Sequence, residues 1–247
     1  GQNFSKAFKI RYLGTDDQEH YAWQTSWGIS WRLIGAVVMV HGDDKGLVIP
    51  PNVAPIQVVI VPILYGKEDK EKILAKAAQI RDALASQSQR VHIDSRDEYT
   101  PGYKFHDWEM KGVPLRIEIG PKDLKQNKVV IARRDTGEKS GVGDDQIQTR
   151  VTEILQEIQR NLFSKAKELL EKNTYAVDDY DELKAKIGSR DGFAKTSWCG
   201  DAKCELKIKE ETGADIRVIP FDSGKLSSGC VYCKREAKHT AYFARAF

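Results

Sequence analysis

The sequence predicts a mixed α/β protein with more than one domain. Residues 56–63 (IQVVIVPI) are almost continuously apolar, which is typical of a strand buried on both faces of a parallel sheet. Residues 68–87 repeat apolar side chains at helical spacing, which predicts an amphipathic helix. Because strand-like and helix-like segments alternate as far as residue 143, we expect a compact α/β unit over residues 53–143.

The other elements of this unit are shorter. We expect strands at residues 91–94, 115–119 and 128–134. We also expect a turn at residues 100–102, followed by a short helix at residues 104–111. The alternation Leu-Arg-Ile-Glu-Ile places Arg116 and Glu118 on the same, more polar face of their strand. Gly141 and Gly143 are expected to break the chain.

The flanking regions are less regular. Residues 144–172 carry the pattern of one long helix. Residues 33–40 fit a buried strand or a helix, and their length and small side chains favour the helix. The remaining expectations are a helix running into a strand at 4–13, a strand at 21–24, a polar turn at 173–181, a helix at 181–187 and a strand at 216–221.

The composition is that of an ordinary soluble protein. Of 247 residues, 30% are charged and 40% are apolar, and the net charge is +3. This mildly basic balance permits a nucleic-acid partner without arguing for one. No run has the length of a transmembrane helix, and the first residues have no signal-peptide pattern. We therefore expect a cytoplasmic protein that does not enter a membrane.

All four cysteines lie after residue 198, so they serve one local purpose. They form two close pairs, Cys199 with Cys204 and Cys230 with Cys233, and each pair can occupy one edge of a zinc tetrahedron. Disulfides and free thiols are the alternatives, but a cytosolic chain disfavours disulfides. Four thiolates leave no open position, so the predicted zinc is structural. His239 is better explained as an ordinary histidine than as a further ligand.

Arg32 stands alone at the start of an apolar segment. Because Arg is almost never buried unpaired, it needs an anionic partner, and a salt bridge and a bound anion remain equally open. Trp27 and Trp31 flank it and Gly28 allows close backbone approach, which suits a ligand with a planar part and a charged part, unless both tryptophans are core residues. The following Asp43-Asp44 pair is read as a turn in preference to a metal site.

A set of polar residues crowds one edge of the α/β unit. Arg and Lys can donate to guanine O6 and N7, a carboxylate can accept from N1 and N2, and Phe can stack on an unstacked base. The alternative is a solvated charged face. The residues are Phe105, Glu109, Arg116, Glu118, Lys122, Asp123 and Lys139.

Three motifs in order give the chain a family resemblance: TSWGISWRLIGAVVMVHGDDKGLVIPP, then PGYKFHDWEMKGVPLRIEIGPKDL, then the closing block with WCGDAKCELKIKEETGADIRVIPF and GCVYCKREAKHTAYFARAF. Together they resemble prolyl-tRNA synthetases of the archaeal and eukaryotic type, over essentially the whole chain. This family is a class II aminoacyl-tRNA synthetase with an extra C-terminal zinc-binding domain.

The resemblance implies three parts. Residues 1–52 would be the end of the antiparallel class II catalytic domain, residues 53–150 a five-stranded mixed-sheet anticodon-binding domain, and residues 151–247 a linker helix with a small α+β zinc-binding domain. In the catalytic part, Arg32 would be the ATP-binding and catalytic arginine. The proline-binding positions would be Ser26, Trp27, Gly28 and Ser30.

The resemblance also assigns the remaining sites. The zinc ligands would be the four cysteines. Two guanines of the proline anticodon would be read by Phe105, Glu109, Arg116, Lys122, Asp123 and Lys139, of which Lys139 is the loosest match because the local length varies there.

The implied reaction joins proline to its tRNA in two steps. ATP with Mg²⁺ activates proline as an adenylate, and the proline is then transferred to tRNA(Pro). The family's motifs 1 and 2, with the dimer interface, fall outside these residues, so we expect the homodimer contact and catalytic activity to be missing from the chain alone. Phe247 stands where the family has a terminal Tyr. The alternative is a non-catalytic tRNA-binding module; the cysteines and SWGISWR argue against a sister synthetase.

Overall fold

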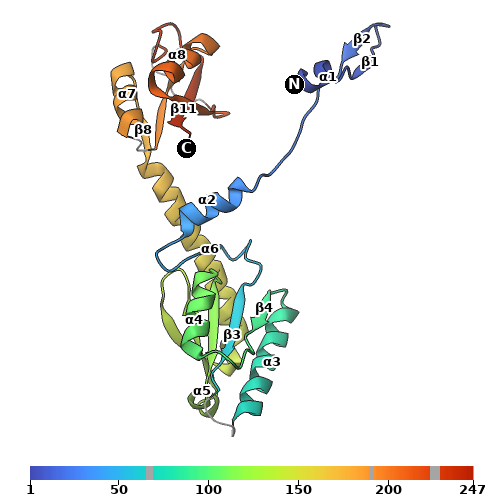
Figure 1. Cartoon of the computed structure of the whole chain (residues 1–247), viewed down its shortest axis with the longest axis vertical. Coiled ribbons are helices and arrows are strands. Elements are labelled where there is room, and N and C mark those ends of the chain that lie inside the picture. The colour runs from blue at the N-terminus through green and yellow to red at the C-terminus, as the bar shows by residue number, and fades with distance from the viewer. Residues whose placement is uncertain (65–68, 190–191, 223–228, 247) are drawn as a thin grey trace.

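The computed structural model describes residues 1–64, 69–189, 192–222 and 229–246 (Figure 1). An α/β unit and a C-terminal unit lie at opposite ends of the long helix α6, Ile147–Lys172. The N-terminal segment extends away from both units and joins the α/β unit through helix α2, Arg32–His41. Glu68, the expected start of one helix, and Phe247 lie outside the described residues.

The α/β unit is built on a five-stranded mixed sheet, as expected. Its strand order is β4-β3-β5-β6-β7; β3 is parallel to β4 and β5, and the pairs β5–β6 and β6–β7 are antiparallel. The strands are β3 (Val58–Pro62), β4 (Val91–Ile93), β5 (Leu115–Ile119), β6 (Lys128–Arg133) and β7 (Lys139–Gly143).

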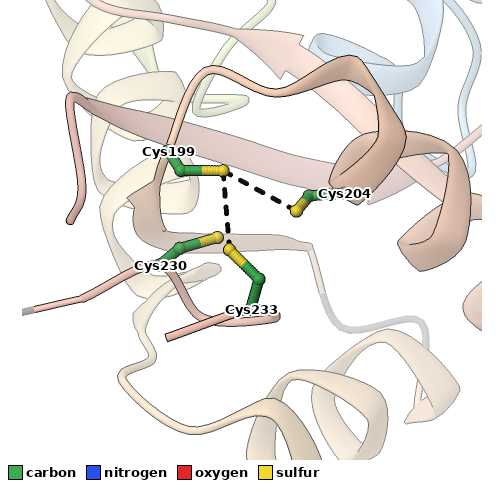
Figure 2. Close-up of side chains that lie close together, drawn as sticks. All are labelled: Cys199, Cys204, Cys230 and Cys233. Carbon is green, nitrogen blue, oxygen red and sulfur yellow. Dashed lines mark hydrogen bonds between the residues drawn. The ribbon is translucent and has the colours of Figure 1, made fainter. Parts of the chain in front are cut away.

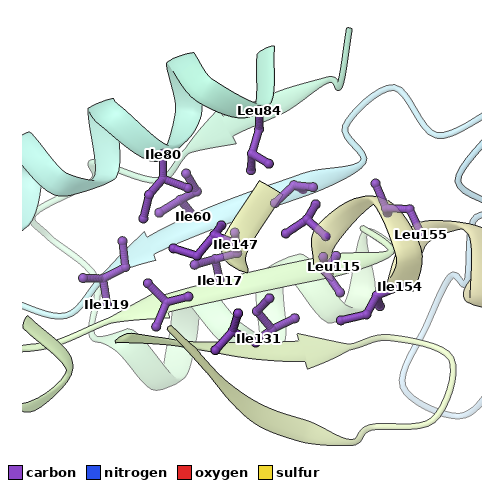
Figure 3. Packing of buried hydrophobic residues seen from close by; sticks show 14 of the residues in the cluster. Ile60, Ile80, Leu84, Leu115, Ile117, Ile119, Ile131, Ile147, Ile154 and Leu155 are labelled. Atoms are coloured by element: carbon purple, nitrogen blue, oxygen red, sulfur yellow. The ribbon is translucent and has the colours of Figure 1, made fainter. Parts of the chain in front are cut away.

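Helices cover both faces of this sheet, which explains why β3 is apolar throughout. On one face, Ile60 and Ile117 pack with apolar residues of α6 and of α3 (Lys70–Ser86) (Figure 3). On the other face, Val59 packs against Trp108 of α4 (Pro101–Met110). Each fully buried Ile, Leu or Val side chain stabilises the unit by about 1.5–3 kcal/mol.

Three parts of this unit differ from the expectations. Residues 100–102 are not a turn but the start of α4, because the Thr100 hydroxyl accepts a hydrogen bond from the Tyr103 amide and Pro101 suits the first helical position. Gly141 and Gly143 do not break the chain; they lie in β7, an edge strand paired with β6. A short helix, α5 (Pro121–Lys125), follows β5 directly.

The C-terminal unit contains more structure than its sequence predicted. A sheet of order β10-β11-β9-β8 packs with helices α7 (Tyr180–Ser189) and α8 (Ala202–Thr212). Its strands are β8 (Thr174–Ala176), β9 (Phe193–Trp198), β10 (Ala214–Val218) and β11 (His239–Arg245). Strand β8 lies in the expected polar turn, and β10 begins and ends earlier than expected.

The N-terminal segment consists of a short helix, a hairpin and α2. The hairpin pairs β1 (Arg11–Leu13) with β2 (Glu19–Tyr21), so β2 ends where the expected strand 21–24 was to begin. Helix α1, Asn3–Ala7, precedes it. The helical reading of residues 33–40 is confirmed, although no residue of α2 is fully buried in this chain. No helix of the described residues is long and apolar enough to cross a membrane.

A turn after α2 fastens the N-terminal segment to the α/β unit. Residues Asp43 and Gly46 form the expected turn, and Asp43 accepts two hydrogen bonds from Arg134, with Nη1–Oδ2 and Nη2–Oδ1 distances of 2.7 and 2.5 Å. The Leu47 amide donates to the Met110 carbonyl. Gly112 has φ +73°, and a Cβ there would lie 2.7 Å from the Leu47 carbonyl carbon, so this close approach requires glycine.

The Asp43–Arg134 ion pair makes stability depend on pH. The hydrogen bonds from Arg134 lower the pKa of Asp43 from 3.8 to about 2. Because the folded pKa is the lower one, the stabilisation is present above pH 4 and is lost as the pH falls through 2. We expect Asp43→Asn to reduce the free energy of unfolding by roughly 1–3 kcal/mol at pH 7, since the buried charge of Arg134 loses its carboxylate partner.

Denaturant unfolding of both proteins between pH 7 and pH 2.5 checks this expectation. The difference between them should shrink below pH 4, where Asp43 itself becomes neutral. Asp44→Asn is the matched control, because Asp44 is exposed and makes no side-chain hydrogen bond or ion pair to the described residues. Equal stability of Asp43→Asn and the unchanged chain at pH 7 would contradict the prediction.

Candidate nucleic-acid interface and metal centre

Three strands and a helix bring the polar residues of the α/β unit together on the face that α4 covers. The alternation of β5 sends Leu115, Ile117 and Ile119 into the core on one side, and Arg116 and Glu118 to the other, as the sequence predicted. In the sheet register Arg116 pairs with Ala132 of β6, and Ala132 pairs with Lys139 of β7. The two cations therefore lie in one row across the sheet.

Glu118 is the centre of this cluster. Its Oε1 accepts from Nε and Nη2 of Arg116, both at 3.0 Å, and its two oxygens lie 2.8 and 3.1 Å from Nζ of Lys139. Arg116 and Glu118 are only 8% and 7% exposed. A buried charge requires a partner, and here each buried charge is paired with an opposite one.

Helix α4 contributes an aromatic ring and a second carboxylate. The Arg116 guanidinium lies 4.3 Å from the centroid of the Phe105 ring, and Lys139 Nζ lies 5.1 Å from it. The Glu109 carboxylate is 3.9 Å from Arg116 Nη1. The structure thus brings together four of the six residues proposed to read the anticodon: Phe105, Glu109, Arg116 and Lys139.

Lys122 and Asp123 lie apart from this cluster, in α5 at the end of β5. Asp123 accepts a hydrogen bond of 3.0 Å from the Gly120 amide and so caps its own helix. Within the part of the chain that the structure describes, neither side chain hydrogen-bonds to Arg116, Glu118 or Lys139. Their predicted contact with a base stays a prediction.

The arrangement presents donors and acceptors beside an aromatic ring. Arg116 and Lys139 offer N–H groups that suit guanine O6 and N7, and Glu109 offers an acceptor that suits guanine N1 and N2. Phe105 and the guanidinium stacked on it offer a flat surface to a base. The cluster therefore has the chemistry for binding an unpaired guanine.

The residues proposed for ATP and proline do not form a closed site in this chain. Ser26, Trp27, Gly28 and Ser30 lie in an exposed segment before α2, and Arg32 is the exposed first residue of α2. Trp27 and Trp31 are 96% and 87% exposed, so neither is a core residue here. Arg32 has no hydrogen bond or ion pair to any residue that the structure describes.

A cavity of about 770 Å³ lies in the C-terminal unit, away from every residue considered so far. Leu170 of α6, Phe193 of β9 and Val218 of β10 contribute to its mainly apolar wall. It holds none of the candidate residues, so size alone does not identify the functional site.

The four cysteine sulfurs come together as the sequence predicted (Figure 2). All lie within 4.8 Å of one another, and the Sγ distances from Cys199 to Cys204 and to Cys233 are both 3.7 Å. Four sulfurs about 2.3 Å from a central zinc would be about 3.8 Å apart. These distances fit a tetrahedral zinc and exceed a disulfide bond, so the four cysteines would hold zinc.

Arg235 lies against the cysteines and was not predicted. Its Nε donates to Cys233 Sγ at 3.3 Å, and its Nη2 donates to Asp201 at 2.8 Å. Burial acts to raise the pKa of Cys233, but the hydrogen bonds from the Arg235 side chain and backbone and from Cys204 and Cys199 together outweigh it and lower the pKa to about 6. His239 is not in the metal-binding group; its ring packs near Trp198, with 5.9 Å between centroids.

Comparison with known proteins identifies both units. A family model described as an anticodon binding domain matches residues 57–161, and one described as prolyl-tRNA synthetase, C-terminal, matches residues 180–247. The proline–tRNA ligase of Cenarchaeum symbiosum (strain A) is 48% identical over all 247 residues, which are 51% of its own length. The chain belongs to the prolyl-tRNA synthetase family.

Other relatives in the prolyl-tRNA synthetase family agree. The proline–tRNA ligase of Alkaliphilus oremlandii (strain OhILAs) and proline–tRNA ligase 2 of Bacillus cereus (strain ZK / E33L) are each 47% identical over the whole chain and 51% of their own lengths. The chain thus spans about half the length of the curated relatives it matches.

Sequence reasoning missed two residues of these sites. Glu118 was placed on the polar edge, but no role was assigned to it; the signal was its spacing of two from Arg116 on a central strand. Arg235 follows the second cysteine pair by two residues, in the sequence Cys-Lys-Arg, and a cation next to several thiolates is expected on charge alone.

We expect the purified chain to contain one zinc per molecule, as measured by inductively coupled plasma mass spectrometry. Cys204→Ser should lose the metal and unfold the C-terminal unit, because the four ligands join β9, α8 and the turn before β11. The α/β unit has its own core and should keep its melting transition.

His239→Ala is the control for this experiment and should keep the full zinc content, since His239 is not in the metal-binding group. A zinc-free chain whose C-terminal unit melts like the zinc-containing form would contradict the prediction.

Proposed function

We propose that this chain works as part of a proline–tRNA ligase and binds the anticodon of tRNA(Pro) through its α/β unit. The observation that carries the proposal is the cluster of Phe105, Glu109, Arg116 and Lys139 inside the region that matches the anticodon-binding family. A face that combines paired cations, a carboxylate and an aromatic ring suits the base edges of guanine better than it suits phosphate. Lys122 and Asp123 at the end of β5 would complete the site.

The catalytic part of the proposal concerns the N-terminal segment. Arg32 would bind ATP, delivered with Mg²⁺, and stabilise the charge of the phosphates during proline activation. Ser26, Trp27, Gly28 and Ser30 would line the proline site. The adenylate would then pass its proline to the 3′ end of the tRNA. The exposure of these residues supports the view that other residues of the complete ligase cover them.

The proposal extends to the surroundings of the enzyme. We place it in the cytoplasm, as a homodimer that pairs through catalytic residues outside these 247. Zinc would be structural, because four cysteines fill its coordination. The division into residues 1–52, 53–150 and 151–247 is likewise a proposal. A non-catalytic tRNA-binding module is the competing function, and the observation that favours it is that Arg32 is exposed and has no partner among the described residues.

The anticodon contact is tested by binding. We expect Arg116→Ala to weaken binding of a tRNA(Pro) anticodon stem-loop by about 1–3 kcal/mol, because guanine loses its donors and Glu118 loses a partner. A stem-loop with both guanines replaced by adenine should bind the variant and the unchanged chain equally. Arg160→Ala, an exposed cation of α6, is the control. Equal weakening for both stem-loops would reduce Arg116 to a backbone contact.

Catalysis is tested by exchange of pyrophosphate into ATP. We expect the 247-residue chain to show no proline-dependent exchange, because Arg32 is without the remaining ATP ligands. A longer protein that includes the rest of the catalytic domain should show exchange, and Arg32→Ala in that protein should abolish it. Exchange by the 247-residue chain would overturn this part of the proposal, and its absence from the longer protein would favour the non-catalytic module.

A further inference from the structure

We propose that Glu118 is a positioning residue for guanine recognition, which holds Arg116 and Lys139 in place and keeps the site from binding phosphate. The inference rests on the proposed anticodon function and goes beyond it by assigning a role to a carboxylate that is buried beneath the reading residues. It is carried by the contacts of Glu118, its burial and the charges around it.

The contacts of Glu118 leave defined donors free. Arg116 directs Nε and one N–H of Nη2 at the carboxylate, at 3.0 Å each. Nη1 also donates to the Phe105 carbonyl at 3.4 Å, so the opposite edge of the guanidinium keeps one N–H of Nη1 and the second N–H of Nη2. That edge is the fork that pairs with O6 and N7 of guanine. The carboxylate thus determines which edge of Arg116 faces a ligand.

Lys139 is held in the same way. Its ammonium lies 2.8 and 3.1 Å from the two oxygens of Glu118, which occupies two of its three donors. Its side chain is half exposed, so the third donor is available to a ligand. A lysine on an edge strand is otherwise a flexible side chain, and the carboxylate removes much of that freedom before a base arrives.

Charge explains why a carboxylate belongs between these cations. Arg116 and Lys139 carry two positive charges, and Glu118 and Glu109 carry two negative charges, so the cluster is neutral. Without Glu118, two adjacent cations would face the RNA with one carboxylate and would attract any phosphate. A neutral, prearranged cluster gives up that attraction and retains hydrogen bonds directed at a base edge.

Glu118→Gln tests the inference, because it keeps the size of the side chain and removes its charge. Fluorescence anisotropy would compare the tRNA(Pro) anticodon stem-loop with one whose two guanines are adenines. We expect the guanine stem-loop to bind about tenfold more weakly and the adenine stem-loop to bind as tightly as before or more tightly. The salt dependence of binding should become steeper by about one phosphate contact. A merely structural role would weaken both stem-loops together.

Glu138→Gln is the matched control, since Glu138 precedes Lys139 in the chain and its exposed side chain makes no hydrogen bond or ion pair to the described residues. It changes the net charge equally and should leave the ratio of the two affinities within twofold. If Glu118→Gln does not fold, as judged by its melting transition, Glu118→Asp replaces it. Aspartate keeps the charge but cannot reach both cations. The guanine stem-loop should therefore bind this variant more weakly, while the adenine stem-loop should bind as weakly as it binds the unchanged chain.

Three results would overturn the inference. The first is a Glu118→Gln or Glu118→Asp variant that prefers guanine as strongly as the unchanged chain does. The second is equal loss of both stem-loops. The third uses a stem-loop whose two guanines are inosines, which lack the guanine amino group. If Glu118→Gln weakens binding of the guanine stem-loop but not of the inosine stem-loop, Glu118 is a direct acceptor from that amino group. Failure of the proposed function looks different, because the unchanged chain would then not prefer the guanine stem-loop.

Discussion

The two-faced strand β5 is the constraint on which the rest of the α/β unit depends. It lies in the middle of the sheet, paired with β3 on one side and β6 on the other, and both of its faces are covered. Its apolar residues therefore build the core, while Arg116 and Glu118 are buried under α4. Charges in such a place must be paired, and the pairing fixes their orientation. Burial is thus what prearranges the donors for a ligand.

Paired charges at the end of β6 also connect the sheet to the helices and to the N-terminal segment. Arg133 donates to Asp135 and to Glu157 of α6, and Asn161 of α6 donates to Asp135. Its neighbour Arg134 points the other way, to Asp43 and to the Glu109 carbonyl at 3.0 Å. Two adjacent arginines thus connect the long helix, α4 and the N-terminal segment. Glu109 faces Arg116 with its side chain and Arg134 with its carbonyl, so the candidate reading site and the attachment of α2 share one helical turn.

The sequence predicted the elements whose periodicity is strong. The apolar run of β3, the alternation of β5 and the spacing of α3 and α6 each follow from one dominant burial pattern. Strand β7 was missed because Gly141 and Gly143 read locally as breakers, whereas pairing with β6 overrides that preference. The first turn of α4 was missed because Thr100-Pro101-Gly102 suits a turn and a helix start equally. Most strands of the C-terminal unit are short, and their sequences do not predict them because it is pairing with neighbouring strands that defines them.

The candidate sites likewise divide into those that the local sequence predicts and those that it does not. Cysteine spacing predicted the metal centre because two close pairs restrict the geometry directly. The resemblance assigned the residues proposed to read guanine. No local pattern could show that Glu118 joins Arg116 to Lys139, since β5 and β7 meet only through the sheet register. The exposed positions Ser26 to Arg32 form no closed site here, because nothing in the described residues covers them, although the helix predicted at residues 33–40 is present.

The long helix relates these sites to each other. At 1.5 Å per residue, the 26 residues of α6 span about 39 Å. Its buried residues, from Ile147 to Leu162, all belong to the α/β core, whereas Phe163, Leu169 and Leu170 are exposed. The second part of the helix therefore works as a spacer that leads directly into β8. Because a helix bends little over three turns, α6 holds the α/β unit and the C-terminal unit apart without a shared core. Each unit has its own apolar core, and the C-terminal unit adds the cluster of four cysteines.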